Sequence, residues 1–498
     1  MSQPTALPQD QLGSWTASAL VFGSSAAVLV VELVALRLLA PYLGLTLETN
    51  TLVIGLALTA IAVGSWWGGR ISDQVSPRRL LGPLMLISGV AVALTPFVVR
   101  SAAEVAGGSL LLLAAAGSVF VPGALLSAVT PAVTKLRLVR LDDTGTVVGR
   151  LSGIGTAGAV FGTVVTGFVL ISRVPVSAIM VGLGIGLVLA AVAVEVRLRR
   201  LKGAGAAGAL LALGGLGAAA APGGCDVETT YHCAIVQEDP ERETGQVLVL
   251  DGVPHSYVDT TDPAYLDFSY IQAAASLVDT AYAAGEPLAA YHLGGGGLTL
   301  PRYLDQARPG TESLVSEIDA GVVQVDRDQL GLTTGEGIDV RVEDGRLGLG
   351  RLEDASRDLV VGDAFGGVSV PWHLTTTEAV GDVRRVLRPG GSYVANLIDH
   401  GALGFARAEV ATLGEVFEHV ALASNPAAIA RDGTGGNLVA VGSDASIDTA
   451  AWQARIEERG LEWQVIEGAD LAAWVGDVEV LSDEFAPVDQ LLTPYPTR

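Results

Sequence analysis

Four consecutive glycines, Gly294 to Gly297, follow the apolar segment Tyr291-His292-Leu293. A strand that ends in glycines lets the backbone approach a ligand, because no Cβ stands in the way. Glu317-Ile318-Asp319 comes about twenty residues later, the interval at which nucleoside-binding folds place an acid that accepts hydrogen bonds from ribose hydroxyls. The glycines alone also fit a plain turn. Together with the acid, they predict a nucleoside-type ligand for the C-terminal half.

The elements around these residues are expected to alternate between strand and helix. The predicted strands are 289–293, 312–318, 340–343, 358–362 and 392–397, and the predicted helices are 265–278, 298–306, 320–330 and 375–387. This alternation implies a parallel sheet that binds its ligands at the carboxyl ends of the strands. Further predictions are a turn at 388–391 and, upstream, a small β-hairpin region with a strand over 246–251 and a turn at Asp251-Gly252.

The first part of the chain is much more apolar than the rest. The 498 residues are 50% hydrophobic, and their mean hydropathy is +0.47. Six stretches are long and apolar enough to cross about 30 Å of hydrocarbon: residues 15–40, 51–71, 80–99, 110–133, 147–171 and 174–196. A seventh, 203–221, consists largely of Gly and Ala and is a weaker candidate. We therefore expect a membrane bundle of six to seven spans, kinked in its fourth span by Pro122 and Pro131.

Basic residues indicate how the bundle is oriented. They cluster in alternate loops, at 70–79, 135–150 and 197–202, and basic loops favour the cytoplasmic side. These loops are therefore predicted to face the cytoplasm, as is the N-terminus of this multi-pass protein of the cell membrane. Residues 1–14 lack the basic start of a cleaved signal peptide, so the first span is expected to be retained. If 203–221 crosses the membrane, the C-terminal half lies outside; otherwise it lies inside. The predicted domains are the bundle at 1–222, the hairpin and linking region at 223–285, and the α/β domain at 286–498.

Charge and cysteine content limit the partners. The net charge is −23, and no lysine occurs after Lys202, so nucleic acid, which requires a basic surface, is not an expected partner. The expected partners are a small amine, the lipid bilayer and a second copy in a homodimer. Cys225 and Cys233 do not have the spacing of a zinc site, and no metal is expected. They form either a local disulfide, which favours an oxidising compartment, or two free thiols.

An ordered set of short motifs resembles the spermidine synthase family, the polyamine aminopropyltransferases. The motifs are Leu250-Asp251-Gly252, Leu293-Gly294-Gly295-Gly296, Glu317-Ile318-Asp319, Glu343-Asp344-Gly345, Asp358-Leu359-Val360-Val361-Gly362-Asp363 and Leu387-Arg388-Pro389-Gly390-Gly391. Glu32, Arg37 and the segment Ala40-Pro41-Tyr42-Leu43-Gly44 are similar to the start of a bacterial branch in which membrane helices precede that domain. The resemblance covers nearly the whole chain. It implies an α-helical membrane bundle followed by a Rossmann-like S-adenosylmethionine-binding domain with a small N-terminal β-hairpin region.

The resemblance also implies roles for individual residues. Gly294 to Gly296 would pass beside the methionine moiety of decarboxylated S-adenosylmethionine, a co-substrate, with no tightly bound cofactor. Glu317 would hold the ribose, and Asp344 would accept a hydrogen bond from the adenine amino group. Asp363 would take a proton from the attacking amine, although an acid after a strand also serves as a helix N-cap. The sulfonium already activates the aminopropyl carbon, so catalysis needs orientation and a deprotonated amine more than a strong acid.

Three departures from the family pattern concern the acceptor. Gly297 stands where soluble members carry an acid near the aminopropyl ammonium, and Gly366 replaces a second acid three residues after Asp363. His255 stands where a glutamine is usual. A diamine site with fewer carboxylates binds a dication less tightly, because each desolvated ammonium needs a partner. The predicted substrate-binding residues are His255, Asp259 and Tyr265, with Tyr257, Asp262 and His373 as further candidates.

Three functions remain open at this point. The first is a membrane-anchored aminopropyltransferase that acts on a diamine such as putrescine. The second is a methyltransferase or other S-adenosylmethionine-dependent transferase with a different acceptor, and the third is a membrane protein that binds its ligand without catalysis. Glu32 inside the first span is a functional candidate, since a charge in a bilayer is costly, but an ion pair with Arg37 would make it structural.

Overall fold

The computed structural model describes residues 12–43, 47–105, 108–138, 141–171, 173–199, 224–335, 337–367, 369–430 and 433–492. The chain divides into two compact units, Met1–Gly224 and Cys225–Arg498. The predicted seventh stretch, 203–221, lies outside the described residues.

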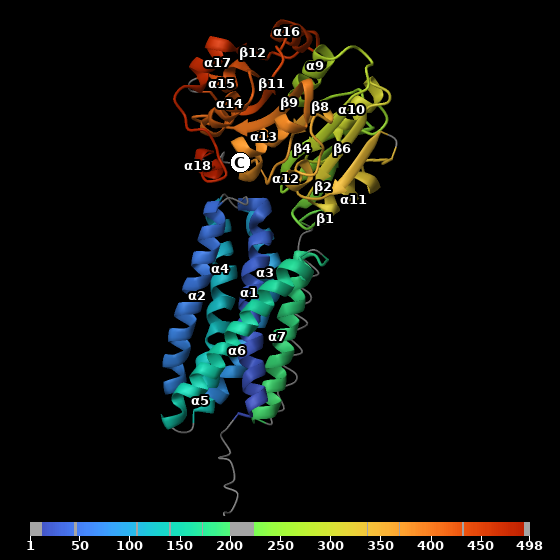
Figure 1. Cartoon of the computed structure of the whole chain (residues 1–498). Helices are drawn as coiled ribbons and strands as arrows, with labels where there is room; N and C mark the ends of the chain where they lie inside the picture. The colour runs from blue at the N-terminus through green and yellow to red at the C-terminus, as the bar shows by residue number, and fades with distance from the viewer. Residues whose placement is uncertain are drawn as a thin grey trace, which may run out of the picture. The chain divides into compact units, whose positions relative to one another are not determined.

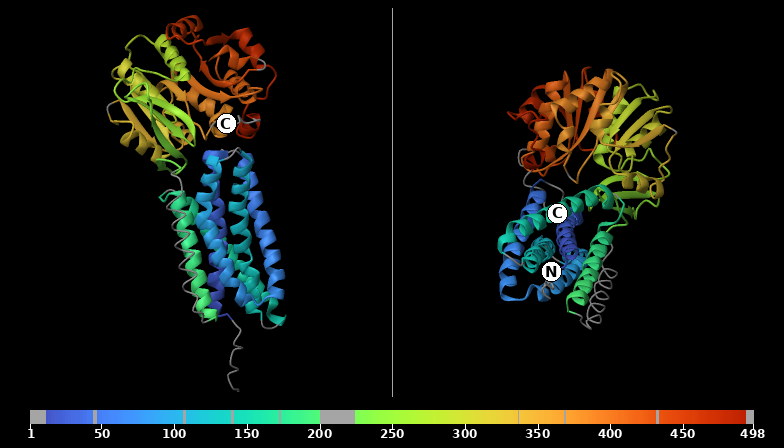
Figure 2. Two further views of the ribbon diagram at one scale, coloured as in Figure 1. Left: turned by 180° about the vertical axis from the view of Figure 1, so that it is seen from behind. Right: turned by 60° about the horizontal axis from the view of Figure 1, so that its bottom comes forward.

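The first unit is a bundle of long helices that run beside one another (Figure 1), as the view from behind also shows (Figure 2). Its elements are α1 (Ser14–Leu43), α2 (Leu47–Gln74), α3 (Pro77–Val105), α4 (Gly108–Ser127), α5 (Val129–Arg137), η1 (Leu141–Asp143), α6 (Thr144–Val165), the π-helical η2 (Thr166–Leu170) and α7 (Val176–Arg199). Six of the described helical segments are long and apolar enough to cross a membrane. They coincide with the six predicted spans, so the prediction of a membrane-type bundle is confirmed.

The predicted kink in the fourth span is a break between two helices. α4 ends at Ser127 and α5 begins at Val129, with Ala128 between them, whereas Pro122 lies inside α4. Pro131 has no N–H to donate to the Ser127 carbonyl, and its ring crowds that carbonyl. The helix is therefore interrupted one turn before Pro131.

Glycines allow the bundle helices to approach one another closely. A Cβ at Gly158 of α6 would lie 2.2 Å from the Phe22 carbonyl oxygen of α1, and one at Gly64 of α2 would lie 2.1 Å from the Ala124 carbonyl oxygen of α4. Neither distance is tolerable for a methyl group. These contacts are of the small-residue kind by which helices associate where water provides no hydrophobic driving force.

The second unit begins with a small antiparallel sheet. Its strands are β1 (Val227–Glu228), β2 (Cys233–Glu238), β3 (Gly245–Leu250) and β4 (Val253–Asp259), in the order β1-β2-β3-β4. Asp251 and Gly252 form the predicted turn between β3 and β4, both with positive φ, at 52° and 76°. Cys225 and Cys233 form a disulfide across a Cα–Cα distance of 5.3 Å, which selects the first of the two alternatives for these cysteines.

The main sheet has eight strands in the order β12-β10-β11-β9-β8-β5-β6-β7 (Figure 1). The strands are β5 (Ala289–Leu293), β6 (Glu312–Glu317), β7 (Ile338–Val342), β8 (Arg357–Gly362), β9 (Leu387–Asp399), β10 (His419–Ser424), β11 (Gly436–Ser443) and β12 (Gln464–Glu467). The expectation of a parallel sheet holds for β5 to β9 only. β11 pairs antiparallel with β9, and β10 pairs antiparallel with both β11 and β12.

Helices cover both faces of this sheet. The helices are α9 (Ser269–Ala281), α10 (Thr299–Ala307), α11 (Ala320–Asp328), α12 (Gly345–Leu349), η3 (Trp372–Leu374), α13 (Thr377–Val386), α14 (Gly404–Val416), α15 (Pro426–Ile429), α16 (Thr449–Glu458), α17 (Gly468–Val475) and α18 (Val488–Leu491). Side chains alternate along the strands, so that Val360 packs in one core cluster with Phe405 of α14 and Leu359 in another with Trp452 of α16. The predicted α/β domain with its hairpin region is thus confirmed.

Two local predictions are wrong in detail. The helix expected from residue 265 begins at Ser269, because the Gln272 side chain donates to the carbonyls of Leu266 (2.9 Å) and Asp267 (2.9 Å) and holds that segment outside the helix. The turn expected at 388–391 is a bulge inside β9, with Gly390 at φ 83°.

The second unit has its own core, and we predict that residues 225–498 fold without the bundle. A fragment with these residues, produced under oxidising conditions, should be monodisperse and should unfold cooperatively when followed by circular dichroism. Recovery only as aggregate, across buffers and tags, would show that the sheet depends on the helices.

Candidate active site

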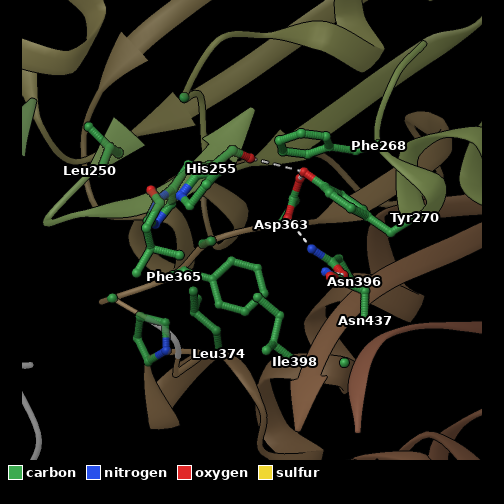
Figure 3. Close-up of a pocket in the computed structure, with 18 of the residues that line it drawn as sticks. Leu250, His255, Phe268, Tyr270, Asp363, Phe365, Leu374, Asn396, Ile398 and Asn437 are labelled. Carbon is green, nitrogen blue, oxygen red and sulfur yellow. Dashed lines mark hydrogen bonds between the residues drawn. The ribbon is translucent and has the colours of Figure 1, made fainter. Parts of the chain in front are cut away.

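A cavity of about 830 Å³ lies at the carboxyl ends of the parallel strands. It is lined by Gly294 to Gly296 after β5, Ser316 and Glu317 at the end of β6, Asp363 after β8, and Asn396 and Ile398 of β9. The hairpin sheet contributes Leu250 and His255, and the start of α9 contributes Phe268 and Tyr270 (Figure 3). The topology therefore gathers residues separated by more than a hundred positions in the sequence.

Glu317 holds the glycine loop in place. One of its carboxylate oxygens accepts from the Gly295 N–H at 2.7 Å, and the other accepts from the Asp319 N–H at 2.8 Å. A Cβ at Gly294, which has φ 98°, would lie 2.2 Å from the Asp363 carbonyl oxygen. The loop consequently requires glycine there, and burial raises the pKa of Glu317 even though both backbone bonds lower it.

Asp344 lies at the cavity, but its oxygens already have partners. One accepts from the Leu347 N–H at 3.0 Å and caps α12, and the other lies 3.1 Å from His373 Nε2. His373 lines the same cavity. A ligand amino group that donates to the Asp344 carboxylate would share its oxygens with the Leu347 N–H and His373 Nε2.

Asp363 is a partly buried carboxylate with two hydrogen-bond donors. Asn396 Nδ2 donates to Asp363 Oδ1 at 2.8 Å, and the Tyr270 hydroxyl donates to Oδ2 at 3.1 Å (Figure 3). Burial raises its pKa to about 6, and the two hydrogen bonds limit that rise. Among the described residues the next helical element after Asp363 is η3, which begins at Trp372, so Asp363 is not a helix N-cap.

The support of Asp363 extends into the antiparallel half of the sheet. Asn437 of β11 donates to Asn396 Oδ1 at 3.0 Å and fixes which way that amide faces. Sequence reasoning missed Tyr270, Asn396 and Asn437, because none belongs to a motif. An apolar strand that carries one asparagine, as β9 and β11 each do, was the only signal for the two amides.

Of the three residues first predicted to bind the substrate, the structure brings only His255 to the cavity; His373, a further candidate, also lines it. His255 is half-buried, and its Nδ1 lies 2.8 Å from the Val253 carbonyl. Its Nε2 is buried and has no hydrogen-bond partner among the described residues. Burial lowers its pKa, which favours the neutral ring. A second histidine, His232, lines the cavity with Nδ1 2.9 Å from Asp251 Oδ2, and the sequence analysis had not singled it out.

Asp259 and Tyr265, predicted to bind the substrate, lie outside this cavity. Asp259 pairs with Arg242, accepts from the backbone of Thr261 (2.9 Å) and Asp262 (2.8 Å), and so closes the loop after β4. The Arg242 guanidinium lies 3.8 Å from the centre of the Tyr265 ring. Arg242 thus pairs with the Asp259 carboxylate and lies over the Tyr265 ring, so both side chains already interact with this arginine.

The two glycines that replace family acids differ in their surroundings. A Cβ at Gly297, with φ 76°, would lie 1.7 Å from Ser256 Oγ, so this backbone leaves no room for a side chain. Gly297 is also held by Asp326, which accepts from its N–H at 3.0 Å. Gly366 has no neighbour closer than 4.0 Å to such a Cβ. The chain could hold an acid at Gly366 but not at Gly297.

The lining has a distinct electrostatic character. Four carboxylates line the cavity, those of Asp267, Glu317, Asp344 and Asp363, and no arginine or lysine does so among the described residues. The described part of the chain also contains no cluster of three or more metal-ligating side chains. Such a site suits a cationic ligand and does not suit a phosphate group.

Comparison with known proteins gives structural matches only. No protein-family model matches the sequence, and no curated protein matches it. A probable spermidine synthase from Corynebacterium glutamicum ATCC 13032 is 29% identical, over 52% of this chain and 96% of its own, with a TM-score of 0.49. A spermidine synthase in complex with the transition state analogue AdoDATO is 16% identical over 53% and 83%, with a TM-score of 0.35. Human methyltransferase-like protein 13, in complex with SAH, is 17% identical over 43% and 94%, with a TM-score of 0.31.

Burial of Asp363 predicts a pH-dependent cost to stability. The pKa rises from 3.8 to about 6 on folding, so this group favours the folded state most below pH 3.8 and loses that contribution as pH rises through 6. Asp363→Asn removes this partly buried charge and should increase the free energy of unfolding above pH 7 by about 1 to 3 kcal/mol, with little difference near pH 3.5.

Urea unfolding of the second unit at several pH values measures this difference. Asp477→Asn, at an exposed position, is the control and should change stability little at any pH. If wild type and Asp363→Asn were equally stable at pH 8, the inference that the ionised Asp363 carboxylate destabilises the fold would be wrong.

Proposed function

We propose that this chain is a transferase that moves an alkyl group from an S-adenosylmethionine-type sulfonium donor to an amine. The first candidate donor is decarboxylated S-adenosylmethionine, which gives aminopropyl transfer to an amine such as putrescine. The observation that carries the proposal is Asp363, a partly buried carboxylate at the carboxyl end of a parallel strand, aligned by Asn396 and Tyr270 on the wall of the cavity.

The charge of the lining supports a sulfonium donor. Sulfonium and ammonium are both cations, and Glu317, Asp344 and Asp363 provide carboxylates without a competing arginine or lysine among the described residues. A dinucleotide would instead place a pyrophosphate near these acids, with no arginine or lysine in the described lining to neutralise it. The glycine loop admits the donor because Gly294 to Gly296 present backbone rather than side chain.

The reaction requires one bond to form and one to break. The nitrogen lone pair of the neutral amine attacks the carbon next to sulfur, the carbon–sulfur bond breaks, and sulfur leaves as a neutral thioether. Asp363, which is largely ionised at pH 7 because its pKa is about 6, takes one proton from the attacking nitrogen as the carbon–nitrogen bond forms, so the product amine is neutral. Tyr270 and Asn396 hold the carboxylate in one orientation, so the amine is directed toward the donor.

Methyl transfer from S-adenosylmethionine is the second candidate. It is favoured by the absence of an acid at Gly297 and Gly366, where aminopropyl transfer to a diamine would use carboxylates. In both reactions Asp363 has the same role, and the acceptor differs.

We further propose that the six apolar helices anchor the enzyme in the cell membrane as a multi-pass protein with a cytoplasmic N-terminus.

Mass spectrometry of products distinguishes these reactions. Full-length protein in detergent is incubated with either S-adenosylmethionine or its decarboxylated form and a panel of mono- and diamines. We expect an amine that has gained an aminopropyl group, formed only with the decarboxylated donor. A gain of a methyl group would establish the second candidate, and no product with either donor would refute a transferase.

Glu317→Ala should weaken donor binding by about 1 to 3 kcal/mol, the loss expected for a buried hydrogen-bond partner. The variant loses both a ribose acceptor and the bond that holds Gly295. Asp344→Ala should weaken binding within the same range. Calorimetry with the donor measures both. Glu312→Ala, at the exposed start of the same strand, is the matched control and should bind normally; unchanged affinity in both test variants would refute the donor site.

Asp363→Asn should reduce turnover at least about a hundredfold while donor affinity stays nearly unchanged. Asparagine keeps the size of the side chain but cannot take the proton. In the wild type, the rate should fall below pH 6 as Asp363 is protonated, and it should rise toward pH 10 as the amine loses its own proton. Near-normal turnover in the variant with every amine would remove Asp363 from the mechanism.

A further inference from the structure

We propose that the acceptor of this transferase is a monoamine with an apolar tail rather than a diamine. The inference rests on the transferase function proposed above and names the chemical class of its second substrate. It comes from the side chains that surround Asp363, the carboxylate that would take the proton from the attacking nitrogen. A diamine carries two ammonium groups, and each one that leaves water needs a partner of its own. The number of carboxylates near Asp363 therefore decides between the two classes of acceptor.

The order of the strands separates two of the other carboxylates from Asp363. β5, which leads into the glycine loop, lies between β8 and β6 in the sheet. Asp363 follows β8 on one side of it, whereas Glu317 of β6 and Asp344, after β7, lie on the other side. Neighbouring strands are about 4.8 Å apart, so Glu317 and Asp344 lie roughly 10 and 14 Å from Asp363 across the sheet. Both acids belong to the part of the cavity that we assign to the donor, and neither is left for the acceptor.

The wall on the acceptor side of Asp363 is apolar. β9 runs parallel to β8, and its Asn396 donates to Asp363 at 2.8 Å. Ile398 follows Asn396 by two residues, so both side chains lie on one face of the strand, about 7 Å apart. Phe365, two residues after Asp363, and Leu374 line the same cavity, and Figure 3 shows their side chains beside Ile398. A short aliphatic chain on the nitrogen at Asp363 would contact this apolar wall.

The polar side chains of this part of the cavity do not replace a second carboxylate. Its amides are neutral and have partners of their own: Asn437 donates to Asn396 at 3.0 Å, and Asn425 caps α15. Asp267 is the fourth carboxylate of the lining, but it is exposed to solvent, and the Tyr265 hydroxyl lies 3.3 Å from it. An exposed carboxylate is screened by water, so it compensates little for an ammonium that leaves water. A second ammonium would therefore lose its hydration without gaining a buried partner.

A monoamine with an apolar tail matches both features of this wall. Its nitrogen faces the one carboxylate, Asp363, and its carbon chain covers apolar surface, which is favourable because that surface leaves water. Ile398 and Phe365 are half-buried, so they retain apolar surface that a ligand can cover. Gly366 has room for a side chain, since no atom lies closer than 4.0 Å to a Cβ there, but it carries none. The acceptor side is therefore built for one nitrogen and a hydrocarbon chain.

Steady-state kinetics with n-butylamine and putrescine test this inference, because the two amines share a chain of four carbons and differ only in the second amino group. Full-length protein in detergent is assayed at pH 8, where alkyl amines are mostly protonated, with whichever donor gives product. We expect kcat/KM to be at least tenfold higher for n-butylamine than for putrescine. It should be intermediate for 4-amino-1-butanol, whose tail is polar but uncharged.

The possible failures of this experiment are distinct. An equal or higher kcat/KM for putrescine would overturn the monoamine and leave the transferase intact. No product from any amine with either donor would refute the transferase itself, and this inference with it.

Ile398→Asp supplies the carboxylate that this wall lacks. The position is half-buried at the cavity, so the new charge stays in contact with water. We expect the ratio of kcat/KM for putrescine to that for n-butylamine to rise at least tenfold over wild type. Ile398→Asn has nearly the same shape without the charge, and this matched control should slow n-butylamine without favouring putrescine. Equal ratios in the two variants would overturn the inference. If Ile398→Asp does not fold, as judged by circular dichroism, the comparison of amines with the wild type remains decisive.

Discussion

A carboxylate removed from water must be held by donors from the protein, and the second unit is arranged around this requirement at Asp363. The parallel order of β5, β8 and β9 brings Asp363 beside Asn396, and the first turn of α9 brings the Tyr270 hydroxyl to the other oxygen. Each donor comes from a different element. If any of these elements were displaced, this partly buried carboxylate would lose one of its donors, at a cost of about 1 to 3 kcal/mol.

The sequence predicted those helices and strands whose residues show a pattern along a short stretch of chain. β5 was predicted exactly at 289–293, because its apolar run ends in glycines, and the six membrane spans follow directly from hydropathy. The antiparallel strands β10, β11 and β12 were not predicted. Their pairing joins segments that have no periodic relation in the sequence, and nothing in the local pattern fixes the direction in which they add to the sheet.

The same limit applies to the site. Gly294 and Glu317 were recognisable because a spacing connects them, and the structure joins their loops through the bond from Gly295. Asn437 acts on Asp363 only through Asn396, a relation that exists across two strands and not along the chain. Asp259 was an attractive candidate as an acid near the hairpin, but its charge is neutralised by an arginine that also stacks on Tyr265. Such competition between charged partners is visible only in three dimensions.

The disulfide between Cys225 and Cys233 has a consequence for how the protein is handled. It closes the loop in which Thr229 and the Tyr231 N–H bond to Asp319, the residue that caps α11 beside Glu317. His232 belongs to the same loop and lines the cavity. Thiol reductants, added routinely during purification, would open this loop and loosen the rim on the Glu317 side. Ligand affinities measured with and without reductant would then describe two states of the protein that differ in the order of this rim. The redox condition should therefore be stated with each value.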